Sequence, residues 1–287
     1  MKKRLSKISL GSANFGLNYG INNKKKIKFY EVEKILNFAN KVKICKIDTA
    51  QSYGDSEKVI GKYIDKFKTK WNVTSKLKNL NLSLEDQFII SKKKLNIYPK
   101  NFIAHNAMLF KNKNFINSVK KFKIKYPKTN IGVSIYSSKE IDEILKGPIK
   151  PDIIQLPISI LDKRLYESKH LQKINKMDIK IQARSIFLQG LFFLDEKIIK
   201  NKFSSAYIPI LKLKELSKKM DISISQLSLL WVLDISEINE VILGVDNLRQ
   251  LEENYETMKI RIKSEIFEEI KKIKFNDPGV LNPQNWQ

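Results

Sequence analysis

Amphipathic segments of helical period recur along most of the chain. Residues 31–42 show the three-and-four-residue spacing of a helix with one buried face. That window has apolar residues at Val32, Ile35, Leu36 and Ala39. The same pattern predicts helices at Glu31–Val42, Ser56–Phe67, Leu84–Leu95, Phe115–Ile124, Ser138–Leu145, Leu165–Ile174, Ile208–Lys218, Ser225–Leu233, Leu248–Met258 and Ser264–Ile273.

Short apolar runs rich in β-branched residues lie between these segments and have the length of buried strands. They are Lys7–Leu10, Ile44–Asp48, Asn72–Lys76, Asn101–His105, Asn130–Ile135, Asp152–Leu156, Ile179–Arg184 and Glu240–Gly244. Strands that alternate with helices, without a linker between them, favour a parallel sheet. Eight such units predict an α/β fold, a single (β/α)8 (TIM) barrel over residues 1–287. The alternative, an open doubly wound sheet, is disfavoured because no G-x-G-x-x-G motif follows an early strand.

The last residues of the chain, 275–287, contain two prolines and no periodicity. We expect them to form an irregular tail over the surface, with Trp286 covering the end of a helix.

Composition excludes several kinds of site. One cysteine excludes an intrachain disulfide and a cysteine-based zinc site, and two histidines disfavour a histidine metal cluster. We therefore expect no metal. No apolar stretch is long enough to span a membrane, and the N-terminus has no apolar core of a secretory signal. The lone Cys45, expected as a small buried strand residue, fits a reduced cytoplasmic location.

The formal net charge of +24 has two interpretations. One is a polyanionic partner such as nucleic acid. The other is a compositional preference for lysine at solvated positions. The lysines are spread over the whole chain rather than gathered in one segment, which favours the second interpretation. We expect no specific nucleic-acid partner.

Polar side chains occupy the ends of several predicted strands. Functional groups of such barrels gather where the carboxyl ends of the strands meet. Each residue alone has a structural explanation, such as a turn cap or a satisfied core histidine, but together they would converge on one mouth. They are Asp48, Lys76, His105, Ser134, Gln155 and Arg184.

The first three of these, with Tyr53 from the loop after the second strand, could deliver a proton to a carbonyl oxygen. An unassisted tyrosine has a pKa of about 10. We expect the Lys76 ammonium to lower that pKa, and Asp48 to hold Lys76 charged. His105 would donate a second hydrogen bond. The set holds neither a nucleophile nor a group of metal ligands, so the reaction needs a hydride from a cofactor.

The segment 48–61 is similar to the signature D-T-A-x-x-Y-G-x-S-E-x-x-I-G of the aldo-keto reductase family. The matching residues are Asp48, Tyr53, Gly54, Ser56, Glu57 and Gly61. The resemblance implies the tetrad Asp48, Tyr53, Lys76 and His105, and the NAD(P)H-dependent reduction of an aldehyde or ketone with Tyr53 as proton donor. A cofactor-binding regulatory or structural protein on the same barrel is the alternative, which the intact tetrad disfavours.

The resemblance also implies a cofactor site. Ser134 and Gln155 match residues that hold the nicotinamide carboxamide, and Arg184 stands where an aromatic residue usually stacks on the nicotinamide. The pyrophosphate loop would include Ser185, Phe187, Gln189 and Gly190, and the adenosine stretch would include Gly244, Val245, Asn247, Gln250, Glu253 and Asn254.

Cofactor preference depends on this last stretch. Gly244 and Gln250 replace the Lys and Arg that many relatives use for the 2′-phosphate, Arg249 is adjacent, and Asp246 disfavours a phosphate. The expected cofactor is NADPH, with NADH as the alternative.

The loop after the first strand would carry the substrate contacts, Asn14, Phe15 and Tyr19. Its polar residues suit a hydroxylated carbonyl compound such as one derived from a sugar. We therefore expect a small carbonyl compound as the partner.

Overall fold

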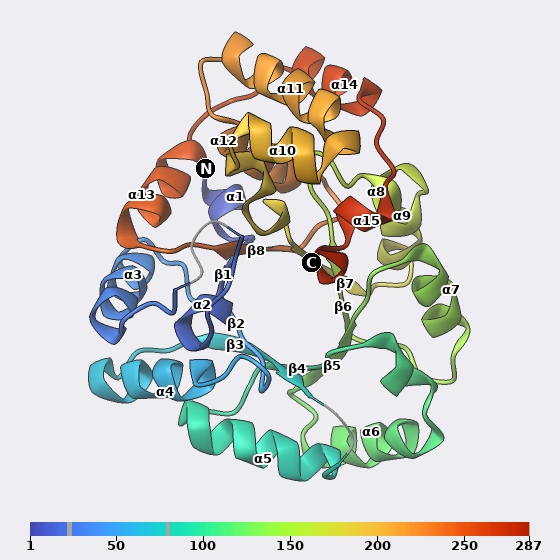
Figure 1. Ribbon diagram of the computed structural model, residues 1–287. Helices are drawn as coiled ribbons and strands as arrows, with labels where there is room; N and C mark the ends of the chain where they lie inside the picture. The colour runs from blue at the N-terminus through green and yellow to red at the C-terminus, as the bar shows by residue number, and fades with distance from the viewer. Residues whose placement is uncertain (22–24, 79–80, 287) are drawn as a thin grey trace.

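The computed structural model describes residues 1–21, 25–78 and 81–286. Eight parallel strands form a closed barrel in chain order, surrounded by helices (Figure 1). The barrel closes where β1 pairs with β8, in the register Ile8 to Val241. The strands are β1 (Ile8–Gly11), β2 (Lys46–Asp48), β3 (Asn72–Leu77), β4 (Asn101–Ala104), β5 (Asn130–Ser134), β6 (Ile153–Pro157), β7 (Lys180–Arg184) and β8 (Glu240–Gly244). This confirms the predicted fold.

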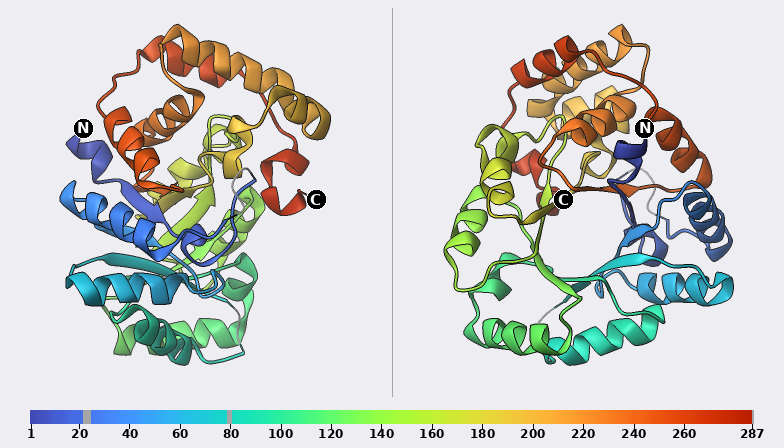
Figure 2. Two further views of the ribbon diagram at one scale, coloured as in Figure 1. Left: turned by 60° about the vertical axis from the view of Figure 1, so that its left-hand side comes forward. Right: turned by 180° about the vertical axis from the view of Figure 1, so that it is seen from behind.

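The helices lie outside the ring of strands, as the side and rear views show (Figure 2). The longer ones are α3 (Phe29–Lys41), α4 (Ser56–Phe67), α5 (Leu84–Leu95), α6 (Lys113–Lys125), α7 (Ser138–Lys146), α9 (His170–Asn175), α10 (Glu196–Lys202), α11 (Ser204–Lys219), α12 (Ile224–Asp234), α13 (Leu248–Thr257) and α14 (Ser264–Lys272). Single turns complete the chain: α1 (Lys2–Leu5), α2 (Ala13–Gly16), η1 (Ala107–Lys111), α8 (Arg164–Glu167), η2 (Leu188–Phe193), α15 (Pro278–Leu281) and η3 (Pro283–Asn285).

The apolar faces of the helices pack on the outer side of the barrel and form the main core. In α3 the buried residues keep the predicted spacing, at Val32, Ile35, Leu36 and Ala39. Side-chain caps fix several helix starts. Ser137 and Glu140 form a reciprocal capping box at α7, and Ser223 begins α12 in the same way with Gln226.

The interior of the barrel is unusually polar. Gln155 and Gln182 are buried on neighbouring strands, and Asn101 donates from its amide to Thr74 Oγ1 over 2.8 Å. Asn130 in turn donates to Asn101 Oδ1 over 2.8 Å. Buried polar groups are tolerated when they are hydrogen-bonded to one another. Polar side chains therefore fill the cylinder between its two ends.

Three local expectations differ from the structure. The predicted helix 165–174 is divided into α8 and α9, because Lys169 adopts a left-handed φ of 60°. Cys45 is exposed and precedes β2, so its assignment as a buried strand residue is wrong. In the described part of the tail, α15 and η3 replace the expected irregular segment, and Gln287 lies outside the described residues.

Trp286 packs on Phe203, with ring centroids 4.9 Å apart, and its indole N–H donates to the Val280 carbonyl over 3.0 Å. The contact with Phe203 joins the tail to the helices after β7, and the hydrogen bond to Val280 lies within the tail. Among the described residues, no helix is both long and apolar enough for a membrane span.

Candidate active site

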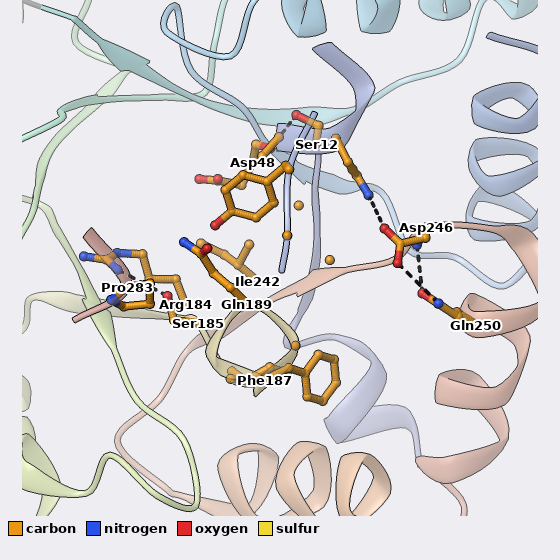
Figure 3. Close-up of a pocket in the computed structure, with 18 of the residues that line it drawn as sticks. Ser12, Asp48, Arg184, Ser185, Phe187, Gln189, Ile242, Asp246, Gln250 and Pro283 are labelled. Carbon is orange, nitrogen blue, oxygen red and sulfur yellow. Dashed lines mark hydrogen bonds between the residues drawn. The ribbon is translucent and has the colours of Figure 1, made fainter. Parts of the chain in front are cut away.

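A cavity of about 760 Å³ opens at the carboxyl ends of the strands. Its lining includes all four residues of the expected tetrad, from β2, the loop after β2, β3 and the residue after β4. Figure 3 shows Arg184 and Pro283 on one side of this cavity and Asp246 and Gln250 on the other. The cavity is therefore elongated, with the tetrad at one part of its floor.

Asp48 and Lys76 form an ion pair at the base of the cavity, with Lys76 Nζ 2.5 Å from Asp48 Oδ2. Both side chains are almost inaccessible, with 5% of Asp48 and 1% of Lys76 exposed. Burial lowers the pKa of Lys76, and the Asp48 carboxylate opposes that effect. Gln155 donates to the second carboxylate oxygen, Asp48 Oδ1, over 2.8 Å. Each charge of the pair is thus held by a partner in the barrel interior.

Further side chains in the barrel interior extend the hydrogen bonds that hold this ion pair. The Gln155 amide also donates to Gln182 Oε1 over 3.2 Å, and Gln182 donates to Glu240 Oε2 over 2.8 Å. Gln182 and Glu240 are not among the residues predicted for the site. A signal was present, because both residues lie an even number of positions before a strand-end residue and so point to the same side of the strand.

Close backbone packing fixes the loop that carries Tyr53. A Cβ added at Gly16 would lie 1.8 Å from the Tyr53 carbonyl oxygen, so only glycine permits this approach of α2. Gly54 has a φ of +55°, in the left-handed region that favours glycine. Ser56, at the start of α4, donates to the Ser12 carbonyl over 2.9 Å. The signature residues therefore hold Tyr53 in place.

Tyr53 lies above the ion pair and beside the histidine. Lys76 Nζ is 5.1 Å from the centroid of the Tyr53 ring, and the His105 ring is 6.0 Å away, edge to face. Burial raises the pKa of Tyr53, with Asp48 acting in the same direction. The pKa of Tyr53 is therefore raised and not lowered as expected, because burial outweighs the effect of nearby cations such as Arg184. The phenol stays protonated throughout the neutral range, as a proton donor must.

His105 is neutral at physiological pH. Burial lowers its pKa to about 4, and the nearby charges of Lys76 and Arg184 act in the same direction. Its Nδ1 lies 3.1 Å from Ser52 Oγ. When Ser52 donates to Nδ1, the remaining imidazole proton is on Nε2, where His105 can donate it to a ligand oxygen.

The depressed pKa of His105 predicts a pH-dependent stability. Between pH 6.5 and about 4 the unfolded chain binds more protons than the folded protein, so the free energy of unfolding falls as pH falls. From neutral pH to pH of about 5 we expect a loss of about 1 to 2 kcal/mol. Urea denaturation at both pH values measures it. His105→Asn should show a smaller loss, and equal losses in the two proteins would contradict the assignment.

The loop after β7 has an unusual backbone. Ser185, Leu188, Gln189 and Gly190 all have positive φ values, between 44° and 98°. Such turns direct successive N–H groups to one side and create anion-binding concavities. Ile21 donates its N–H to the Gln189 carbonyl over 3.1 Å, which joins this loop to the segment after β1.

The far end of the cavity is acidic. Asn14 donates to the Val245 carbonyl over 2.7 Å and to Asp246 Oδ1 over 3.1 Å. The Asp246 N–H donates to Gln250 Oε1 over 2.8 Å. Asn14 therefore ties α2 to the loop after β8. Arg249, which does not line the cavity, donates to Glu253 over 2.8 Å.

Most residues predicted for cofactor or substrate line the cavity, with two exceptions. Val245 and Phe15 are buried in the core and are absent from the lining, so we no longer assign them to ligand contacts. The residues of the lining that sequence analysis did not assign to the site are Gly11, Ser12, Ala13, Gly20, Tyr136, Ile186, Phe193, Ser223, Ser225, Gln226, Ile242, Asp246, Thr257 and Pro283. Within the described residues, no group of His, Cys, Asp and Glu side chains could hold a metal ion.

Comparison with known proteins agrees with this geometry. The model of the aldo/keto reductase family matches residues 7–274. No curated protein matches the chain. Two similar solved structures are aldo-keto reductases, and at such low identity their likeness shows the fold alone.

The first is the thermostable aldo-keto reductase Tm1743 in complex with the inhibitor epalrestat, with 22% identity, coverage of 93% of this chain and 94% of that one, and a TM-score of 0.71. The second is the aldo-keto reductase AKR11C1 from Bacillus halodurans in its holo form, with 17% identity, coverage of 98% and 95%, and a TM-score of 0.76. Because the family model covers most of its length, the chain belongs to the aldo/keto reductase family.

Proposed function

We propose that the protein reduces an aldehyde or ketone to the alcohol with a nicotinamide cofactor, and that Tyr53 is the proton donor. The observation that carries the proposal is the meeting of a protonated phenol, a buried ion pair and a neutral histidine in one cavity. Family membership supports the same reaction. When bound, the reduced cofactor supplies the hydride.

Each residue of the tetrad would have a separate role in the reaction. Tyr53 donates its proton to the carbonyl oxygen, and neutral His105 donates a hydrogen bond from Nε2 to the same oxygen. The Lys76 ammonium, fixed by Asp48, stabilises the phenolate that forms when the proton leaves. Charge develops on the ligand oxygen and on Tyr53 only during the reaction, so this preorganised arrangement favours the transition state.

The cavity fits a nicotinamide dinucleotide. Gln155 Oε1 is buried without a hydrogen-bond partner among the described residues, and a carboxamide N–H would satisfy it. The left-handed turn of the loop 185–190 suits a pyrophosphate, but the N–H groups of Leu188 and Gly190 do not serve it, because they donate to the Ser185 and Phe187 carbonyls over 2.9 Å. With the reactive ring beside Tyr53, the adenosine would extend toward the N-terminus of α13, which Asn247 caps. Ser134, Phe187 and Asn254 also line this path.

The charges at the adenosine end favour NADH over the NADPH that the resemblance suggested. Asp246 and Glu253 line this end; among the described residues no Lys or Arg is in the lining there, and Arg249, outside it, is paired with Glu253 over 2.8 Å. A 2′-phosphate would be repelled by the Asp246 carboxylate, whereas a carboxylate can accept a hydrogen bond from a ribose hydroxyl.

We therefore expect NADH to bind at least about 10-fold more tightly than NADPH, because a charge-assisted contact to the phosphate is missing. Fluorescence titration of both cofactors measures the ratio. Gly244→Lys should improve NADPH binding, since no atom lies within 4 Å of a Cβ added at Gly244. Tighter NADPH binding by the unaltered protein would contradict this assignment.

A substrate panel at saturating cofactor tests the reaction itself. Tyr19 and Tyr136 line the cavity at its catalytic end, and Asn14 is occupied with Asp246. We expect oxidation of the reduced cofactor with small polar aldehydes, including sugar-derived ones. If no carbonyl compound in the panel supports cofactor oxidation, the proposed function is wrong.

A further inference from the structure

Arg184, the last residue of β7, has a fixed guanidinium at the catalytic end of the cavity. Its Cζ atom lies 4.1 Å from the centroid of the Tyr136 ring. One terminal nitrogen, Nη2, donates to the Ile135 carbonyl over 3.0 Å, and the other, Nη1, donates to Ser185 Oγ over 3.3 Å. Stacking and hydrogen bonds together limit the rotation of this side chain. The cation is thus positioned before any ligand arrives.

This guanidinium is uncompensated. Among the described residues, no carboxylate forms an ion pair with Arg184, whereas Asp48 and Lys76 balance each other at 2.5 Å. His105 is neutral, because burial lowers its pKa to about 4. The catalytic end of the cavity therefore carries one net positive charge, and the carboxylates of Asp246 and Glu253 lie at the other end.

The Arg184 guanidinium also keeps hydrogen-bonding capacity. A guanidinium has five N–H donors, and each terminal nitrogen carries two. In the described structure, Nη1 and Nη2 of Arg184 each use one N–H on a protein oxygen. Nε donates to Ser134 Oγ over 3.4 Å, and one N–H on each terminal nitrogen remains for the oxygens of a carboxylate or phosphate. A half-buried cation with donors in reserve is stabilised most by an anionic ligand.

The geometry points to Arg184 as the receptor for an anionic group of the substrate, so that the protein selects carbonyl compounds bearing a carboxylate or a phosphate ester. This inference rests on the proposed function. Within one cavity, the carbonyl would meet Tyr53 and His105 while the anionic group binds Arg184.

Three aldehydes of similar size test this selection: 4-formylbenzoate, 4-formylphenyl phosphate and the neutral methyl 4-formylbenzoate. We expect kcat/KM for at least one anion to exceed that of the ester by about 10- to 100-fold, the range of a charge-assisted hydrogen bond. The difference should lie mainly in KM. The anion that benefits more distinguishes a carboxylate from a phosphate preference.

Arg184→Met should remove this preference, whereas Arg184→Lys should retain part of it. Arg261→Met removes an exposed arginine and controls for net charge. Equal kcat/KM for all three aldehydes in the unaltered protein would overturn the inference and leave the reductase assignment intact. Equal losses for anionic and neutral aldehydes in Arg184→Met, with weaker NADH binding, would also overturn it, because Arg184 would then serve the cofactor. Turnover of none of the aldehydes would count against the proposed function itself.

Discussion

Tyr53→Phe is expected to lower the rate of hydride transfer by about 10²- to 10⁴-fold, the usual contribution of a positioned acid. The substitution removes the proton and leaves the aromatic ring, which packs beside His105 with centroids 6.0 Å apart. Binding of the reduced cofactor should be unchanged. Single-turnover oxidation of bound cofactor, followed by absorbance after mixing with an aldehyde, measures the loss.

Tyr63→Phe is the matched control for this experiment. Tyr63 lies in α4 outside the cavity lining, and its hydroxyl donates to Asn37 Oδ1 over 2.8 Å. Loss of that hydrogen bond should cost about 1 kcal/mol of stability with little effect on turnover. A Tyr53→Phe protein that transfers hydride at the unaltered rate would show that another group is the acid.

Lys76→Met is expected to reduce both stability and activity. The change leaves the Asp48 carboxylate, on a side chain that is 5% exposed, with Gln155 as its remaining side-chain partner in the described structure. Breaking a buried ion pair from one side costs about 3 to 5 kcal/mol. Urea denaturation measures this loss, and the double variant Asp48→Asn with Lys76→Met should recover part of it, because the uncompensated charge is then removed.

An exposed ion pair provides the comparison. Lys272 Nζ lies 2.5 Å from Glu269 Oε1, the same separation as in the buried pair, but both side chains are exposed. Lys272→Met should therefore change the free energy of unfolding far less than Lys76→Met does. Equal losses in Lys76→Met and Lys272→Met would contradict the view that burial gives the Asp48–Lys76 pair its importance.

The barrel could be predicted because the alternation of strand and helix patterns is repeated along the whole chain. Segments such as 56–67 and 84–95 match α4 and α5 at both ends, because their apolar spacing is regular, and Ser83 also caps α5. Short elements were not predictable in the same way. The seven-residue helix α10 is too short to show a period, and the break at Lys169 depends on a left-handed backbone conformation that a lysine does not signal.

The tetrad could be found from strand ends and from the signature, but its electrostatics could not. The raised pKa of Tyr53 results from burial and from Asp48, and burial is a property of the folded cavity. Phe15 shows the same limit, because its neighbours on the loop line the cavity while its own ring points into the core. The position of the Arg184 guanidinium likewise depends on its stacking on Tyr136, a contact that no motif predicts.

The most direct test of the central claim follows the hydride. The protein is loaded with NADH deuterated at the transferable position of the nicotinamide and mixed with 4-formylbenzoate or a sugar-derived aldehyde. We expect one deuterium at the carbinol carbon of the alcohol for each cofactor oxidised. Saturable binding of NADH without transfer to any carbonyl compound would contradict the claim and favour a cofactor-binding regulatory or structural role.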